Sequence, residues 1–186
     1  MYHALRVNPQ TGFYEFEDYN DDGVIDRDDR QWIEDLAPKF YGGLGNIVTY
    51  KNISLDFFFQ FRKQKGRNYL DITSTAGINR NTPVELYDRW QEPGDIAPIQ
   101  KAGFNNPNQN DSNAAISDAS FVRLRNITLN YKVPKMVSCG MNMNLYVQGQ
   151  NLLTFTNFKG RGADPEQTSS ATLPPLQQIT LGVQLG

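Results

Sequence analysis

The feature that most constrains this chain is a strict alternation of apolar and polar side chains along several long segments. In residues 53–61 every odd position is apolar, and the even positions carry Ser, Asp, Phe and Gln. Successive side chains of a β-strand point to opposite faces, so this segment presents one wholly apolar face and one mostly polar face. The pattern returns in residues 143–148 and 179–185. We therefore expect an all-β chain whose strands each turn one face to an apolar surrounding.

Strands and connections alternate in a regular way along the chain. Strands are expected over residues 39–50, 53–64, 120–133, 143–155 and 177–186, with a one-residue bulge near Arg125-Asn126 that reconciles a change of parity. The connections run long, short, long, short, long: 17–38, 51–52, 65–119, 134–142 and 156–176. Outer-membrane barrels have short periplasmic turns and long extracellular loops, so residues 1–186 read as one antiparallel barrel segment with three extracellular loops and a final strand.

Composition leaves two fold classes open. Mean hydropathy is −0.56 and no long apolar run is present, which excludes a helical span but not barrel strands, whose apolar residues are diluted by alternation. A soluble β-sandwich would need the same alternation for its core. The two differ in whether seven residues face outward together or inward against a second sheet: Leu55, Phe57, Phe59, Leu145, Val147, Leu181 and Val183. The net charge of −2 gives no reason to expect nucleic acid.

One short helix is expected inside the long 65–119 connection. Thr82 offers an N-cap, Pro83 suits the first helical position and Glu85 the third, ahead of residues 86–90. Pro93-Gly94 ends it. The aromatic residues of this connection (Tyr87, Trp90, Phe104) suit either stacking on sugar rings or a packed loop interior.

The sharpest local motif is an acidic run in the 17–38 loop. Taking Asp18 as position one, oxygen-bearing side chains occupy positions one, three, five, nine and twelve, Gly23 is at six, and position seven offers a backbone carbonyl. This spacing fits the EF-hand loop, with Asp in place of the usual Glu at twelve. The candidate calcium ligands are Asp18, Asn20, Asp22, Val24, Asp26 and Asp29. A solvated acidic turn at Asp22-Gly23 is the alternative.

Two further groups suggest contact with a membrane. A basic cluster at the end of the second strand suits the phosphates of outer-membrane lipid or a solvated rim: Arg62, Lys63, Lys65 and Arg67. Aromatic residues near strand ends suit interfacial girdles or a soluble core: Phe40, Tyr50, Tyr69, Tyr131, Phe155 and Phe158.

Catalytic patterns find no support. His3 and Cys139 are the only histidine and thiol, and they lie in unrelated segments. The glycines of residues 42–45 lie inside a strand pattern rather than ahead of a phosphate-binding helix. We therefore expect no enzyme.

From about residue 14 to the end, the order of motifs resembles the C-terminal end of the SusC/RagA family of TonB-linked outer-membrane transporters of Bacteroidetes. The resemblance rests on the acidic loop, then on Ala37–Leu44, Leu55–Gln60, Asp88-Arg89-Trp90, Ser117–Tyr131 and Leu145–Phe155. It implies a transmembrane barrel of about 22 strands with a plugged lumen, of which this chain supplies about the last five.

The resemblance also implies a function. In that family a SusD-like lipoprotein covers the barrel at the cell surface, and glycans or peptides are imported with energy delivered through TonB. The TonB-contacting region and the plug would lie upstream, and no signal peptide follows Met1, so we expect a fragment or truncated product. The family usually ends on an aromatic residue, whereas this chain stops at Leu185-Gly186. The alternative is a soluble β-rich calcium-binding module, with or without glycan binding.

Overall fold

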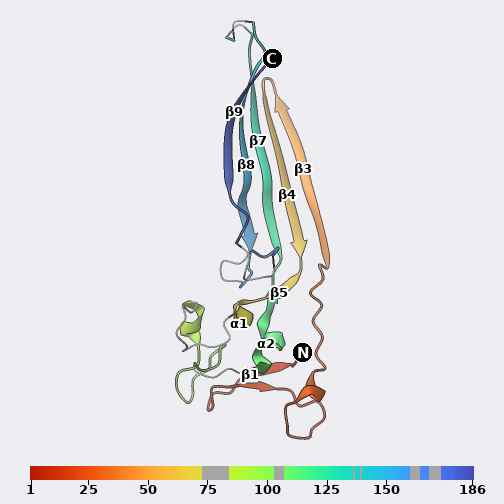
Figure 1. Ribbon diagram of the computed structural model, residues 1–186, viewed down its shortest axis with the longest axis vertical. Coiled ribbons are helices and arrows are strands. Elements are labelled where there is room, and N and C mark those ends of the chain that lie inside the picture. The colour runs from red at the N-terminus through yellow and green to blue at the C-terminus, as the bar shows by residue number, and fades with distance from the viewer. Residues whose placement is uncertain (73–83, 103–106, 136, 139, 160–163, 168–172) are drawn as a thin grey trace.

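The main feature of the computed structural model is one five-stranded antiparallel sheet with strand order β3-β4-β7-β8-β9 (Figure 1). Its strands are β3 Phe40–Tyr50, β4 Ile53–Lys63, β7 Phe121–Val133, β8 Met143–Thr156 and β9 Gln178–Leu185. The structure describes residues 1–72, 84–102, 107–135, 137–138, 140–159, 164–167 and 173–186. Strand order follows chain order; short turns join β3 to β4 and β7 to β8, and longer connections join the other neighbours.

Smaller elements gather at one end of the sheet, which we call the loop end; the opposite end, with the short turns, is the turn end (Figure 1). In the described part of the chain they are the hairpin of β1 Ala4–Val7 and β2 Tyr14–Phe16, the pair β5 Lys65–Arg67 and β6 Ile116–Asp118, and five short helices. The helices are η1 Arg27–Asp29, α1 Tyr69–Ile72, η2 Val84–Asp88, α2 Pro107–Asn110 and η3 Asn113–Ala115. Within the described ranges, none of the helices has the length and apolar character needed to cross a membrane.

The register places most apolar positions of the five strands on one face, the apolar face. Directly paired residues of antiparallel strands share a face, so each row across the sheet can be read from the pairing. One such row is Val48, Leu55, Leu129, Val147 and Leu181. Val147 is 42% exposed and Leu181 74%, and no second sheet covers them in the described part of the chain. The seven diagnostic residues therefore face outward together, as a barrel wall requires and a sandwich does not.

The opposite face of the sheet, the polar face, carries mainly amides, hydroxyls and charged groups, together with Ile47 and Phe58. The row beside the last one is Ile47, Asp56, Thr128, Gln148 and Thr180. This sheet therefore has two unlike faces, as a barrel wall needs: an apolar face for lipid and a polar face for the lumen.

The predicted bulge in β7 is confirmed. The pairing with β4 shifts between Phe58 and Phe59, which lie opposite Asn126 and Leu124, and this leaves Arg125 as an extra residue. On β8 the same irregularity includes Asn151, whose φ of 53° lies in the left-handed region that Asn tolerates better than most residues. The bulge brings Arg125 to the polar face beside Gln60, where Arg123 already lies by pairing.

The long 65–119 connection has more structure than its composition predicts. Leu70, Leu86, Ile99 and Ala115 are buried together in a small core at the loop end. The expected helix is present as the 3₁₀ helix η2, while its predicted cap, Thr82-Pro83, lies outside the described residues. Trp90 is 9% exposed and its indole nitrogen donates to the Pro9 carbonyl at 2.8 Å, so this aromatic packs in the loop interior. Tyr87 is exposed, and Phe104 lies outside the described residues.

Candidate functional site

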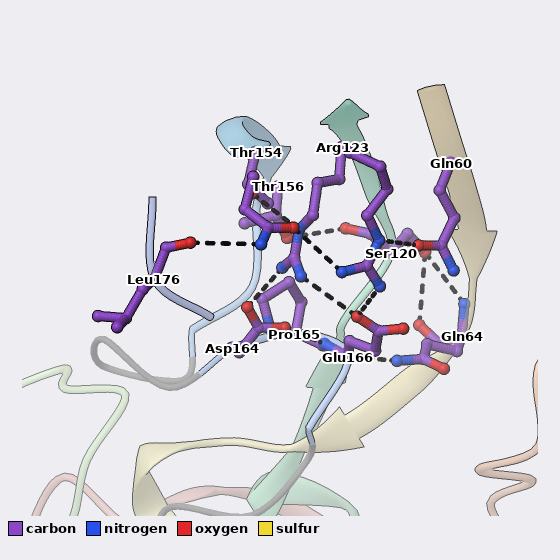
Figure 2. Close-up of polar contacts among 12 residues, drawn as sticks. Gln60, Gln64, Ser120, Arg123, Thr154, Thr156, Asp164, Pro165, Glu166 and Leu176 are labelled. Carbon is purple, nitrogen blue, oxygen red and sulfur yellow. Dashed lines mark hydrogen bonds and ion pairs between the residues drawn. The ribbon is translucent and has the colours of Figure 1, made fainter. Parts of the chain in front are cut away.

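A cluster of charged side chains lies on the polar face at the loop end of the sheet. Figure 2 shows Arg123 of β7 pointing to the short segment that carries Asp164 and Glu166. Arg123 is 1% exposed and Asp164 4%, so both charges are withdrawn from water. Removing a charge from water is costly unless it is paired and hydrogen-bonded, so this site depends on its partners.

All three guanidinium nitrogens of Arg123 have partners. Nη2 donates to Oδ2 of Asp164 at 2.5 Å, Nη1 to Oε2 of Glu166 at 3.2 Å, and Nε to Oγ1 of Thr154 at 3.0 Å (Figure 2). The planar guanidinium presents its donors as a rigid fork, so it can hold two carboxylates and a hydroxyl in fixed directions. Arg123 thereby joins β7 to β8 and to the 164–166 segment.

Arg125 repeats the arrangement one step along the bulge. Its Nη2 donates to the same Glu166 oxygen at 2.5 Å, its Nε to Oε1 of Gln60 at 2.5 Å, and its Nη1 to Oδ1 of Asn151 at 3.2 Å. One Glu166 oxygen therefore bridges two guanidinium groups. With two arginines and two carboxylates, the formal charge of the cluster is balanced.

In the sequence, Arg123 and Arg125 alternate with Val122 and Leu124 and so belong to the polar side of the strand pattern, but nothing in the pattern indicates their acidic partners. Asp164 lies 41 residues from Arg123, and Glu166 lies 43 from it. The sequence does show two cations on the polar side of one strand and two acids in a later connection. This pattern predicts that the arginines need negatively charged partners, but it does not predict which connection supplies them.

The acidic 17–38 loop is organised around Asp29, which is fully buried. One Asp29 oxygen accepts from the Tyr19 amide and the other from the Asp26 amide, each at 2.8 Å. Asp18 accepts from the Gly23 amide at 2.8 Å, and its other oxygen is buried without a hydrogen-bond partner. Gly23 has a φ of 80°, which explains why glycine occupies the sixth position.

The other predicted calcium ligands lie in the same loop with exposed side chains. Asn20 and Asp22 bond to each other at 2.9 Å, and Asp26 accepts from the Asp28 amide. Among the described residues, no three or more His, Cys, Asp or Glu side chains form a group that could hold a metal ion. The structure thus brings the candidate ligands into one hydrogen-bonded loop but does not gather their carboxylates around a common point.

The basic cluster is largely paired within the chain. Lys63 binds Asp118 at 2.6 Å, Lys65 binds Glu34, and Arg67 donates to the Asn110 carbonyl at 3.3 Å. Hydrogen bonds from Lys63 and Ser120 lower the pKa of Asp118 to about 2. Lys65 likewise holds the pKa of Glu34 below its usual value. Three of the four predicted rim cations therefore tie loop-end segments together.

Comparisons with known proteins give a consistent assignment. The chain is 31% identical to TonB-dependent receptor P3 of Formosa agariphila over 81% of its length, and 32% identical to TonB-dependent receptor P26 over 88%. It spans only 15% and 17% of those relatives. No family model matches the chain.

Solved structures with a similar fold include the RagAB peptide importer in its open-open state, with a TM-score of 0.76. The match covers 100% of this chain and 22% of that one at 23% identity, and it shows the fold. A second structure, of the RagAB peptide transporter, gives a TM-score of 0.75.

Proposed function

The chain belongs to the TonB-dependent transporters of the outer membrane and has the SusC/RagA type of barrel wall, and on that premise we propose that it forms part of the wall of a nutrient importer. The cargo we propose is peptide or oligosaccharide, taken up with a SusD-like surface lipoprotein and with energy delivered by TonB to a plug region outside this chain. The role we propose is binding and passage, without catalysis.

The observation that carries this proposal is the pair of unlike faces on one uncovered sheet. The apolar face suits lipid, and the polar face suits a hydrated lumen. The loop end, with its longer connections, is then extracellular, and the turn end is periplasmic. A soluble calcium-binding module is disfavoured because it would leave Leu181 and Val183 exposed to water, at 74% and 60%.

Uptake by whole cells tests the proposal. Cells that carry the complete transporter should accumulate labelled oligopeptides or labelled oligosaccharides, and deletion of its gene or of TonB should abolish accumulation of one of these two classes. The lipoprotein should copurify with the transporter in mild detergent. If deletion of the transporter gene or of TonB leaves the uptake of both oligopeptides and oligosaccharides unchanged, the importer assignment is wrong.

We also propose that the acidic loop binds one calcium ion. The supporting observations are the spacing of its oxygen ligands and the buried, unpartnered oxygen of Asp18. A carboxylate oxygen has lone pairs beyond the one that accepts an amide, so the bonds made by Asp29 leave room for coordination. Calcium would offset the repulsion among the loop's acids, and the side chains of Asp22 and Asp26 would have to turn inward.

Titration calorimetry on the detergent-solubilised transporter measures this binding. We expect one site that Asp18→Asn removes. Asp21→Asn is the matched control, because Asp21 carries the same charge in the same loop but lies outside the ligand set. Equal loss in both variants would indicate a nonspecific acidic loop, and no calcium uptake at millimolar concentration would exclude the site.

A further inference from the structure

We infer that residues 164–167 form a latch, held by Arg123 and Arg125, that fixes the extracellular end of the polar face. That the latch lies in the lumen at the extracellular end rests on the proposed function, because the polar face lines a lumen only if the sheet is part of a barrel wall. The contacts themselves do not depend on that function. The residues that carry the latch are those of Figure 2.

The latch joins three neighbouring strands. Arg123 and Arg125 project from β7 and bond to Thr154 and Asn151 of β8. On the other side, Arg125 bonds to Gln60 of β4. The two arginines of β7 therefore connect the two carboxylates of the 164–167 segment to both neighbouring strands.

Further hydrogen bonds hold the same connection in place. The side-chain amide of Gln64, directly after β4, donates to the Pro165 carbonyl at 2.6 Å. Near β9, Gln177 donates to the Leu152 carbonyl at 2.9 Å, and Asn151 donates to the Leu176 carbonyl at 3.3 Å. The 164–167 segment is thus bonded directly to the residue after β4 and, through the two arginines, to the stretch of β8 that also holds residues 176–177.

Burial makes the latch different from a surface ion pair. Exposed pairs contribute little, whereas removing one member of a buried pair leaves an uncompensated charge and is strongly destabilising. The side chains of Arg123 and Asp164 are 2% and 4% exposed. Loss of the Arg123 charge should therefore release Asp164 to water rather than leave it buried, and Glu166 would keep only its bond to Arg125.

The latch has a consequence for transport. Cargo that enters the proposed barrel must pass the extracellular end of the polar face, where these contacts hold the 164–167 segment at the wall. Arg123 and Arg125 are in this sense positioning residues: they keep a chain segment at the wall and out of the path.

Thiol labelling in living cells tests the latch. The complete transporter carries Cys139→Ser and Pro165→Cys, and intact cells are treated with a membrane-impermeant maleimide. Pro165 is buried, so labelling should be slow with the latch intact. Arg123→Met should accelerate it at least about tenfold, because an unpaired Asp164 favours the released state. Lys159→Met is the matched control: it removes a cation from the same connection, and its ammonium has no polar partner among the described residues.

The heat-dependent gel mobility of folded barrels separates release of the latch from failure to assemble. If Arg123→Met does not assemble, the double variant Arg123→Met, Asp164→Asn is read instead, since it leaves no uncompensated charge at the Arg123–Asp164 pair. Fast labelling of an assembled barrel in either variant supports the latch. Labelling as slow as in Lys159→Met overturns it. Failure of both variants to assemble also overturns the latch, because the two arginines and two carboxylates would then be required for the wall to fold.

The labelling rate needs neither cargo nor TonB. A negative result would therefore refute the latch and leave the importer proposal standing, and a failed uptake assay would leave the latch untouched.

Discussion

The outward position of Phe57 gives a prediction whose size depends on depth in the membrane. Phe57 is the third of the five apolar outward residues of β4, between Ile53 at the turn end and Phe61 at the loop end. Ile53 and Phe61 are eight residue steps apart, or about 27 Å along the strand at a rise of about 3.4 Å per residue. At a tilt of about 40° this covers about 21 Å of membrane thickness, close to the apolar band of about 25 Å in outer-membrane barrels. Phe57 therefore lies near the midplane.

An arginine at the midplane of a barrel wall costs roughly 2–4 kcal/mol, and near the interface about 0–1 kcal/mol. Phe57→Arg should thus destabilise the transporter by about 2–4 kcal/mol, and Ile53→Arg by about 1 kcal/mol or less. The assay is urea unfolding of the transporter refolded in lipid vesicles, followed by gel mobility. Asp56→Asn, on the polar face, should leave the midpoint unchanged.

The depth dependence is what discriminates between lipid and a packed protein core. A protein core penalises a buried arginine wherever it lies along the strand. Equal destabilisation by Phe57→Arg and Ile53→Arg would therefore refute the lipid-facing assignment of the apolar face, even if both variants are unstable.

Two further predictions concern the loop end. A Cβ on Gly12 would lie 2.5 Å from the Trp90 ring, so Gly12→Ala should lower the free energy of unfolding in urea by roughly 1–3 kcal/mol more than Gly94→Ala does. Gly94 is the control because it also has a positive φ but has open space around it. Equal losses in the two variants would contradict the packing of Trp90. The low pKa of Asp118, about 2, lies below its unfolded value, so the Lys63–Asp118 pair should stabilise the loop end above about pH 4 and lose this effect as the pH falls through about 2. The stability difference between the parent and Asp118→Asn, measured at pH 7 and pH 2, should shrink at the lower pH; a constant difference would show that the carboxylate charge does not act there.

The sequence by itself determined the wall. Alternation with a period of two depends only on the geometry of an extended backbone, so it could be read without knowing any partner strand. It placed Leu55 and Val147 on one face and Asp56 and Gln148 on the other, as the pairing confirms. The change of parity at Arg125 likewise predicted the bulge, because an extra residue is the local way to shift a face.

Only the tertiary structure decided what the loops contact. Arg123 and Asp164 are 41 residues apart, and Trp90 meets the carbonyl of Pro9 across 81 residues. Such contacts depend on where an irregular connection returns to the sheet, and no period in the sequence encodes that path. The two arginines could be placed on the polar face from the strand alone, but their neutralising carboxylates could not, because a charge on a loop has no fixed direction until the loop has folded.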